Sequence, residues 1–186
     1  MKILKILGIV VLALVVLVLA VGLIVPTEYA VERSVVIAKP RSEVFRLVGS
    51  LRNQARWSPW ADNDPAMKVT YTGADGTVGS SSAWQGNSDV GTGEQEIKDL
   101  VPNEMVHNEV RFREPIESVG QVFLTLSDVA AGTSTKVTWK MTGKNAYPMN
   151  AMSVVMDMDG MIGKDFERGL DKLKKLSEQP AAVATN

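Results

Sequence analysis

Few side chains in this sequence of 186 residues could act as nucleophiles, general bases or metal ligands. There is one histidine, His107, and no cysteine, which excludes disulfides, thiolate catalysis and cysteine-based metal sites. His107 alternates with Glu109 and Arg111 on the face of a predicted strand opposite Val106 and Val110, so we interpret it as a solvated residue. We therefore expect no histidine-based triad, no zinc or other metal site, and no cofactor.

Two glycine-rich segments, GADGTVGS at 73–80 and GNSDVGTG at 86–93, raise the question of a phosphate-binding loop. Each lies between two strand-like runs, and neither leads into a helix N-terminus whose amide groups could hold a phosphate. Both are typical of hairpin turns instead. Nucleic-acid binding is not expected either, because the formal net charge is −1 and the basic residues are scattered along the chain.

Asp159 is the carboxylate with the strongest case for a chemical role. On a helix of 3.6 residues per turn it falls in the middle of the apolar side, whereas Asp157 points away from that side. A lone carboxylate facing an apolar interior is costly unless it is paired, hydrogen-bonded or protonated. Asp159 therefore either contacts a ligand or a polar network, or the helix breaks at Gly160 and Asp159 caps its second half. The rest of the apolar side comprises Met152, Val155, Met156, Gly163, Phe166, Leu170 and Leu173.

Aromatic and thioether side chains cluster in two places. The segment RWSPWADNDP at 56–65 holds Trp57 and Trp60 among turn-forming and acidic residues, and each indole can bury about 150–250 Å². The pair either packs as plain core or also forms the wall of a binding site. The methionines between residues 149 and 161 pose the same choice, since Met serves as core filler and as an adaptable contact for apolar molecules. Glycines in the same stretch either bring the helix closer to a sheet or leave room for a guest.

Residues 6–25 form an uncharged apolar run, ILGIVVLALVVLVLAVGLIV. About 20 helical residues cross a bilayer core of roughly 30 Å. A cleavable signal peptide would have about 7–15 apolar residues followed by a small-residue cleavage site. The candidate site, Ala20-Val21-Gly22, lies inside the run. We therefore favour a retained transmembrane anchor.

Basic residues before the anchor indicate its orientation. Lys2 and Lys5 precede the run, which favours an N-terminal tail (residues 1–5) in the cytoplasm and a single-pass protein of the inner (plasma) membrane with its domain outside. Arg33, Lys39 and Arg41 follow the run, and they reduce the difference in positive charge between its two sides. Pro26 ends the helix, so a short linker holds the domain against the bilayer surface.

The remaining pattern predicts one α+β domain. Residues 29–38 alternate as a strand, two short helices follow from Pro40 and at 52–56, and six strand-like runs occupy 67–143. A strongly curved antiparallel sheet wrapped around one long helix satisfies this order.

The long helix is predicted at residues 149–176, which carry the apolar side described above. The polar and small residues 178–186 read as a disordered tail. The domain therefore extends over 29–177.

The inner face of the sheet is predicted to be apolar with a few polar groups, because alternate residues of a strand share a face. The run GEQEIKDLV places Gln95 and Asp99 on the face of Ile97 and Val101, and Trp84 also faces inward. Asp99 is thus a second candidate for acid–base chemistry. The other inward sets are Val106, Asn108, Val110 and Phe112; Val122, Leu124 and Leu126; and Val137, Trp139 and Met141.

Four motifs in order carry a family resemblance: WSPW from residue 57, YTGADGTVGSSSAWQGNSDVGTGEQEI, GTSTKVTWKMTG and DMDGMIGKDFERGLDKLKKL. Together they resemble the SRPBCC superfamily, and more narrowly its polyketide cyclase/dehydrase-like branch, over about residues 29–177. The resemblance implies a helix-grip fold, in which a seven-stranded antiparallel sheet grips a long C-terminal helix and an apolar cavity lies between them. Relatives include START lipid-transfer domains, the birch-pollen allergen family and aromatic polyketide cyclases.

This resemblance and the anchor lead to the hypothesis of a membrane-anchored module that holds a lipid, isoprenoid or aromatic molecule. An alternative is an enzyme of the cyclase or dehydratase type that uses Asp159 as acid or base. A further alternative is a protein-interaction module, whose partner the sequence does not name. The residues expected to contact the ligand are Trp57, Trp60, Trp84, Gln95, Asn108, Phe112, Leu124, Trp139, Met152, Met156 and Asp159.

Overall fold

Seven segments with alternating apolar residues pair into one antiparallel sheet. The structure, a computed structural model, describes residues 2–155 and 157–179. The strand order is β1-β7-β6-β5-β4-β3-β2, so β1 pairs with β7 and β2 forms the far edge. The strands are β1 (Glu28–Ile37), β2 (Lys68–Thr72), β3 (Ser81–Gln85), β4 (Thr92–Val101), β5 (Met105–Glu114), β6 (Ser118–Val129) and β7 (Ser134–Lys144).

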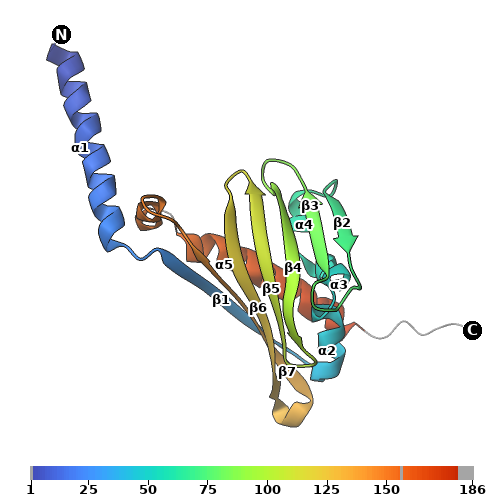
Figure 1. The fold of residues 1–186 in the computed structure, drawn as a ribbon. Coiled ribbons are helices and arrows are strands. Elements are labelled where there is room, and N and C mark those ends of the chain that lie inside the picture. The colour runs from blue at the N-terminus through green and yellow to red at the C-terminus, as the bar shows by residue number, and fades with distance from the viewer. Residues whose placement is uncertain (1, 156, 180–186) are drawn as a thin grey trace, which may run out of the picture.

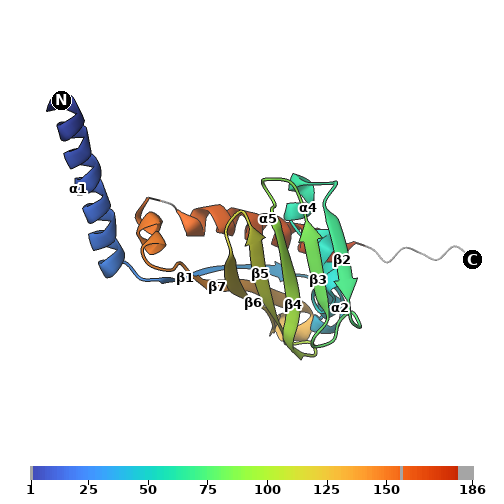
Figure 2. The ribbon, with the colours of Figure 1, turned by 45° about the horizontal axis from the view of Figure 1, so that its top comes forward.

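The helices of the domain lie on one face of this sheet, whereas α1 projects away from it (Figure 1). The long helix α5 crosses that face and packs mainly on β1, and α2 and α3 lie near its C-terminal end (Figures 1 and 2). This arrangement confirms the predicted α+β class and helix-grip architecture. The helices are α1 (Lys2–Ile24), α2 (Arg41–Val48), α3 (Leu51–Trp57), α4 (Trp60–Asn63) and α5 (Met158–Glu178), with 3₁₀ helices η1 (Ala130–Gly132) and η2 (Met149–Val154).

Helix α3 begins at a well-defined cap. The Ser50 hydroxyl accepts a hydrogen bond from the Asn53 amide at 3.1 Å, and the Leu51 amide donates to Asp75 at 2.9 Å. The buried residues of α3 then follow at a spacing of three, Leu51, Gln54 and Trp57. The cap thus directs one amide and one indole side chain toward the sheet.

The predicted single helix at 149–176 is wrong at its start. Its first part is the 3₁₀ helix η2, and α5 begins only at Met158. The reason is a cap: the Asp157 carboxylate accepts a hydrogen bond from the Gly160 amide at 2.8 Å, and Asp157 itself has non-helical dihedral angles. A break was one of the two alternatives, but Asp157 and not Asp159 makes the cap. Apolar residues keep a helical spacing on both sides of this break, so the sequence pattern did not reveal it.

The C-terminal end of α5 agrees more closely with the sequence pattern. The helix extends to Glu178, one residue beyond the predicted domain boundary. Residues 180–186 of the predicted disordered tail lie outside the described residues, and so does Met156.

Strand β4 departs from simple alternation because of a β-bulge. Ile97 pairs with Asn108, but the next pair is Asp99 with His107, so Lys98 is the extra residue. The bulge reverses the faces that follow it. Leu100 therefore packs on the core, whereas Asp99 and Val101 are exposed, contrary to the prediction that they face inward.

Helix α1 is long and apolar enough to cross a membrane, as residues 6–25 predicted. It begins at Lys2 and so includes residues assigned above to a separate tail. Along α1 only Gly22 is buried, and the helix projects away from the domain (Figure 1). The other side chains of its apolar stretch are thus available for lipid contact.

Candidate functional site

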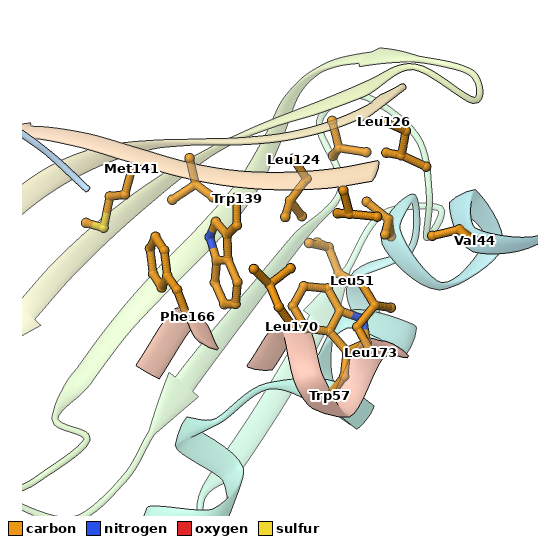
Figure 3. Close-up of a cluster of buried hydrophobic side chains, with 14 of the residues drawn as sticks. Val44, Leu51, Trp57, Leu124, Leu126, Trp139, Met141, Phe166, Leu170 and Leu173 are labelled. Carbon is orange, nitrogen blue, oxygen red and sulfur yellow. The ribbon is translucent and has the colours of Figure 1, made fainter. Parts of the chain in front are cut away.

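The sequence analysis placed the ligand contacts in the region between α5 and the sheet. Trp139 lies at the centre of this region. The Trp139 ring stacks on Phe166 at 4.1 Å between centroids with an 8° interplanar angle. Trp57 and Trp60 approach the same ring edge-on at 5.3 and 5.8 Å. Trp57 and Trp139 are only 2% and 5% exposed, and Leu124 lies beside Trp139 on the sheet (Figure 3). Trp57 is therefore part of the core, and Trp60 packs against it.

Side chains, rather than open space, fill much of this region in the present conformation. Several glycines on the inward surfaces of the sheet and α5 lie directly beneath a large side chain. A Cβ atom at any of these positions would collide with the side chain that covers it. The pairs are Gly93 with Trp84, Gly120 with Met141, Gly143 with Tyr29, Gly163 with Arg33, and Gly169 with Trp139. These glycines therefore make room for large side chains of the protein itself, which occupy the positions that a Cβ would take.

A cluster of amide side chains interrupts the apolar interior. The Gln54 side-chain oxygen accepts hydrogen bonds from Gln95 at 2.8 Å and from Asn108 at 3.2 Å. The Gln54 side-chain nitrogen donates to the Val48 carbonyl at 2.7 Å, which fixes its orientation. Gln95 and Asn108 were predicted from strand parity, and Gln54 was not. The spacing of Gln54 from Leu51 and Trp57 on one side of α3 was the signal for it.

Two polar atoms in this interior have no hydrogen-bond partner among the described residues: the side-chain oxygen of Asn108 and the indole nitrogen of Trp139. Asn108 is on β5 and Trp139 is on β7, and β6 runs between them with Val122 and Leu124 on the same face. Since neighbouring strands are about 4.8 Å apart, the two residues are separated by about 10 Å across the sheet. Buried polar atoms without partners are rare and require an explanation.

Trp84 and Phe112 extend the apolar surface toward the β2 edge of the sheet. Their rings meet edge-on at 5.8 Å, and both side chains are half-buried. The Trp84 indole donates to the Val90 carbonyl at 3.4 Å. The predicted inward direction of both residues is confirmed.

Asp159 does not face the interior as its position on the helix predicted. Its side chain is 60% exposed, and its two oxygens pair with the Arg33 guanidinium at 2.9 and 3.0 Å. Arg33 also bonds Glu167 at 2.9 Å, so one arginine of β1 holds two carboxylates of α5. The hydrogen bonds from Arg33 lower the pKa of Asp159, which keeps the carboxylate charged. A charged, ion-paired group is poorly suited to act as a general acid.

Met152 is also outside the interior, because it belongs to η2 and not to α5, and its side chain is exposed. His107 lies on the outer face of the sheet, as predicted, where its ring stacks on Phe123 and its Nε2 atom lies 2.7 Å from the Gln121 oxygen. Within residues 2–155 and 157–179, no three His, Asp or Glu side chains gather as a metal ion would require.

A groove of about 260 Å³ lies at the end of the domain nearest α1. Tyr29 reaches from its wall over Gly143 onto the inner face of the sheet, and burial raises the pKa of the Tyr29 hydroxyl. The groove therefore offers the neutral Tyr29 hydroxyl and three carboxylates beside apolar surface. Its lining residues are Pro26, Thr27, Glu28, Tyr29, Asn145, Ser153, Asp157, Met158 and Asp159.

The sequence matches a protein family described as polyketide cyclase / dehydrase and lipid transport, over residues 29–178. No curated protein matches the chain. Solved structures do. A protein from Chromobacterium violaceum is 16% identical, with a TM-score of 0.57 over 83% of this chain and 99% of that chain.

Two further structures have the same fold. A protein from Bacillus thuringiensis is 13% identical, with a TM-score of 0.59 over 81% of this chain and 100% of that chain. The structure of Ara h 8.0201 is 12% identical, with a TM-score of 0.55 over 81% of this chain and 97% of that chain. At these identities the likeness shows the fold, and together with the family match it confirms the predicted SRPBCC superfamily.

Proposed function

The chain belongs to the polyketide cyclase/dehydrase and lipid transport family, and from that premise we propose that it is a membrane-anchored module for a hydrophobic small molecule. The molecule is a lipid, an isoprenoid or an aromatic compound, and it binds between the sheet and α5. Helix α1 is the anchor, with its N-terminus in the cytoplasm and the domain on the outer side of the plasma membrane. The basic residues Lys2 and Lys5 support this orientation.

The observation that carries the proposal concerns three buried side-chain polar atoms that lack partners among the described residues: two of them, on Asn108 and Trp139, lie between the sheet and α5, and the third is on Asn150 of η2. Each such atom costs about 1–3 kcal/mol when it is left unbonded. A ligand with an acceptor for the Trp139 N–H and a donor for the Asn108 oxygen removes that cost. The surrounding Leu124 and Phe166 side chains favour an otherwise apolar molecule.

Room for the ligand comes from side-chain rotation. Met141 lies over Gly120 and Tyr29 lies over Gly143, and these side chains cover backbone that carries no Cβ. When such a side chain turns away, the volume it leaves is bounded by bare glycine backbone. The sheet and α5 can therefore stay in place while the interior opens.

The membrane tether gives this module a physical advantage. A poorly soluble molecule partitions into the bilayer, and only Val25, Pro26 and Thr27 separate α1 from β1. At no more than about 3.5 Å per residue, such a connection keeps the domain within about 10 Å of the end of α1. The ligand then needs no passage through bulk water.

Quenching of tryptophan fluorescence by a dibrominated fatty acid tests the proposal on the full chain in detergent micelles. Bromine quenches on contact, and all four tryptophans belong to the domain. We expect saturable quenching as the acyl chain reaches the interior indoles. The variant Gly120→Leu fills the proposed space from the sheet side, and we expect it to lose the saturable component.

Val119→Leu is the matched control, because Val119 is the preceding residue of β6 and is exposed on the opposite face. It should bind like the parent chain. Circular dichroism verifies that both variants are folded. An absence of saturable quenching in the parent chain, or equal quenching in Gly120→Leu, would refute the proposed ligand site.

A further inference from the structure

The segment between β7 and α5 has an unusual surface. Residues 145–155, NAYPMNAMSVV, carry no charged side chain. Several of their apolar side chains point into solvent rather than into the core, and Val155 is 77% exposed. The other exposed apolar residues of the segment are Tyr147, Met149, Met152 and Val154. An exposed apolar cluster of this kind marks an interaction surface.

This segment is fastened to the end of α1. The Asn150 side-chain nitrogen donates to the carbonyls of Gly22 and Val25 at 2.7 and 2.8 Å, and Asn150 is fully buried. The ring of Tyr147 packs against Gly22, where a Cβ would crowd it. η2 therefore lies beside the last turn of α1 in both views (Figures 1 and 2).

The position along α1 sets a depth relative to a bilayer. Twenty-three helical residues at 1.5 Å each extend about 35 Å, slightly more than a hydrocarbon core of about 30 Å. Gly22 is two residues from the end of α1, so η2 lies at the level of the interface between acyl chains and headgroups. Charged groups follow just beyond this level, including the Glu28–Lys144 ion pair at 2.9 Å.

We propose that the η2 segment (residues 147–155) inserts into the outer interface of the bilayer and forms a second membrane contact beside α1. The proposal rests on α1 being the membrane anchor. Apolar side chains with a tyrosine among them suit this layer, where one end of a ring is apolar and the other is wet. The partner is thus the lipid surface itself.

The contact determines how the domain stands on the membrane. Ser153 of η2 and Pro26 next to α1 both line the 260 Å³ groove, so an inserted η2 directs this groove toward the headgroups. Tyr29 connects the groove to the inner face of the sheet over Gly143. A ligand leaving the bilayer would meet this end of the domain first.

Single-cysteine spin labelling in phosphatidylcholine vesicles tests the proposal, since the native chain has no cysteine. Nitroxides are placed on the full chain at Met149→Cys and Val155→Cys. Val78→Cys is the matched control, because Val78 is 60% exposed and lies in the loop between β2 and β3, at the far edge of the sheet. Leu12→Cys reports on α1. The measurement compares collisions with oxygen, which concentrates in lipid, and with a nickel chelate, which stays in water.

We expect an oxygen-to-nickel accessibility ratio at positions 149 and 155 several-fold higher than at 78. Ratios at 149 and 155 equal to that at 78, with a lipid-like ratio at 12, would overturn the η2 contact and leave the anchor intact. A water-like ratio at 12 would overturn the anchor and the η2 contact together. Protection of 149 and 155 from both reagents, with spin–spin broadening, would show that a second copy of the chain covers η2, and would also overturn the proposal.

Discussion

Trp57 and Trp139 are two buried indoles whose N–H groups differ in whether they have a hydrogen-bond partner. The Trp57 nitrogen donates to the Leu47 carbonyl at 3.1 Å. The Trp139 nitrogen has no partner among the described residues. Replacing each tryptophan with phenylalanine therefore removes a satisfied donor in one case and an unsatisfied donor in the other.

The expected difference follows from two contributions to the free energy of unfolding. Both substitutions leave a small void, at a cost of about 1 kcal/mol each. Trp57→Phe also loses a hydrogen bond, which costs about 1 kcal/mol more. Trp139→Phe instead relieves a desolvated donor and recovers about 1–3 kcal/mol. We therefore expect Trp57→Phe to be less stable than Trp139→Phe by about 2–4 kcal/mol.

Thermal unfolding of the delipidated full chain in detergent, followed by near-ultraviolet circular dichroism, measures this difference. For a domain of this size, 1 kcal/mol corresponds to about 2–4 °C in Tm, so a difference of about 2–4 kcal/mol corresponds to roughly 4–16 °C. Equal Tm values, or a lower Tm for Trp139→Phe, would show that the Trp139 N–H is already bonded in the resting protein. The argument from unpartnered atoms would then fail.

Three further substitutions examine other parts of the structure. Asp159→Asn should weaken the dependence of Tm on pH in the acid range. Arg33 lowers the pKa of Asp159, so the ion pair stabilises the fold above about pH 4. This stabilisation is lost as the pH falls toward the lowered pKa of Asp159. Tm between pH 7 and pH 3 measures this, and parallel profiles would contradict it. Gly93→Ala should destabilise by about 1–3 kcal/mol, because its Cβ meets the Arg111 carbonyl, which cannot rotate away as a side chain could; urea unfolding without a shift in midpoint would contradict this. Asn150→Ala should loosen α1 from the domain, since two hydrogen bonds are lost. A nitroxide in the α1–β1 linker should then gain mobility, and an unchanged spectrum would count against the junction.

The sequence alone was sufficient for the class of fold. Strict alternation in the runs around Val122, Val137 and Trp139 identifies strands with one buried face, because the side-chain period of a strand is two. The same parity identified Gln95 and Asn108 as polar residues of the interior. The apolar run at 6–25 has a length that few structures other than a membrane span require.

Positions that depend on contacts between distant segments could not be predicted in this way. The bulge at Lys98 reverses the exposure of Asp99 and is a property of how β4 pairs with β5. The cap at Asp157 ends a spacing pattern that continued through Val155. Asp159 is drawn to the surface by Arg33, which is 126 residues away in the chain.

Local spacing therefore determined which residues form the strands and most of the helices, and which face most of them bury. The tertiary structure decided which polar groups find partners and whether glycines leave open space or side chains fill it. The physical reason is that a hydrogen bond between Gln54 and Asn108, or a ring lying over Gly143, depends on three-dimensional proximity across the fold. Periodicity along the chain contains no information about such pairs.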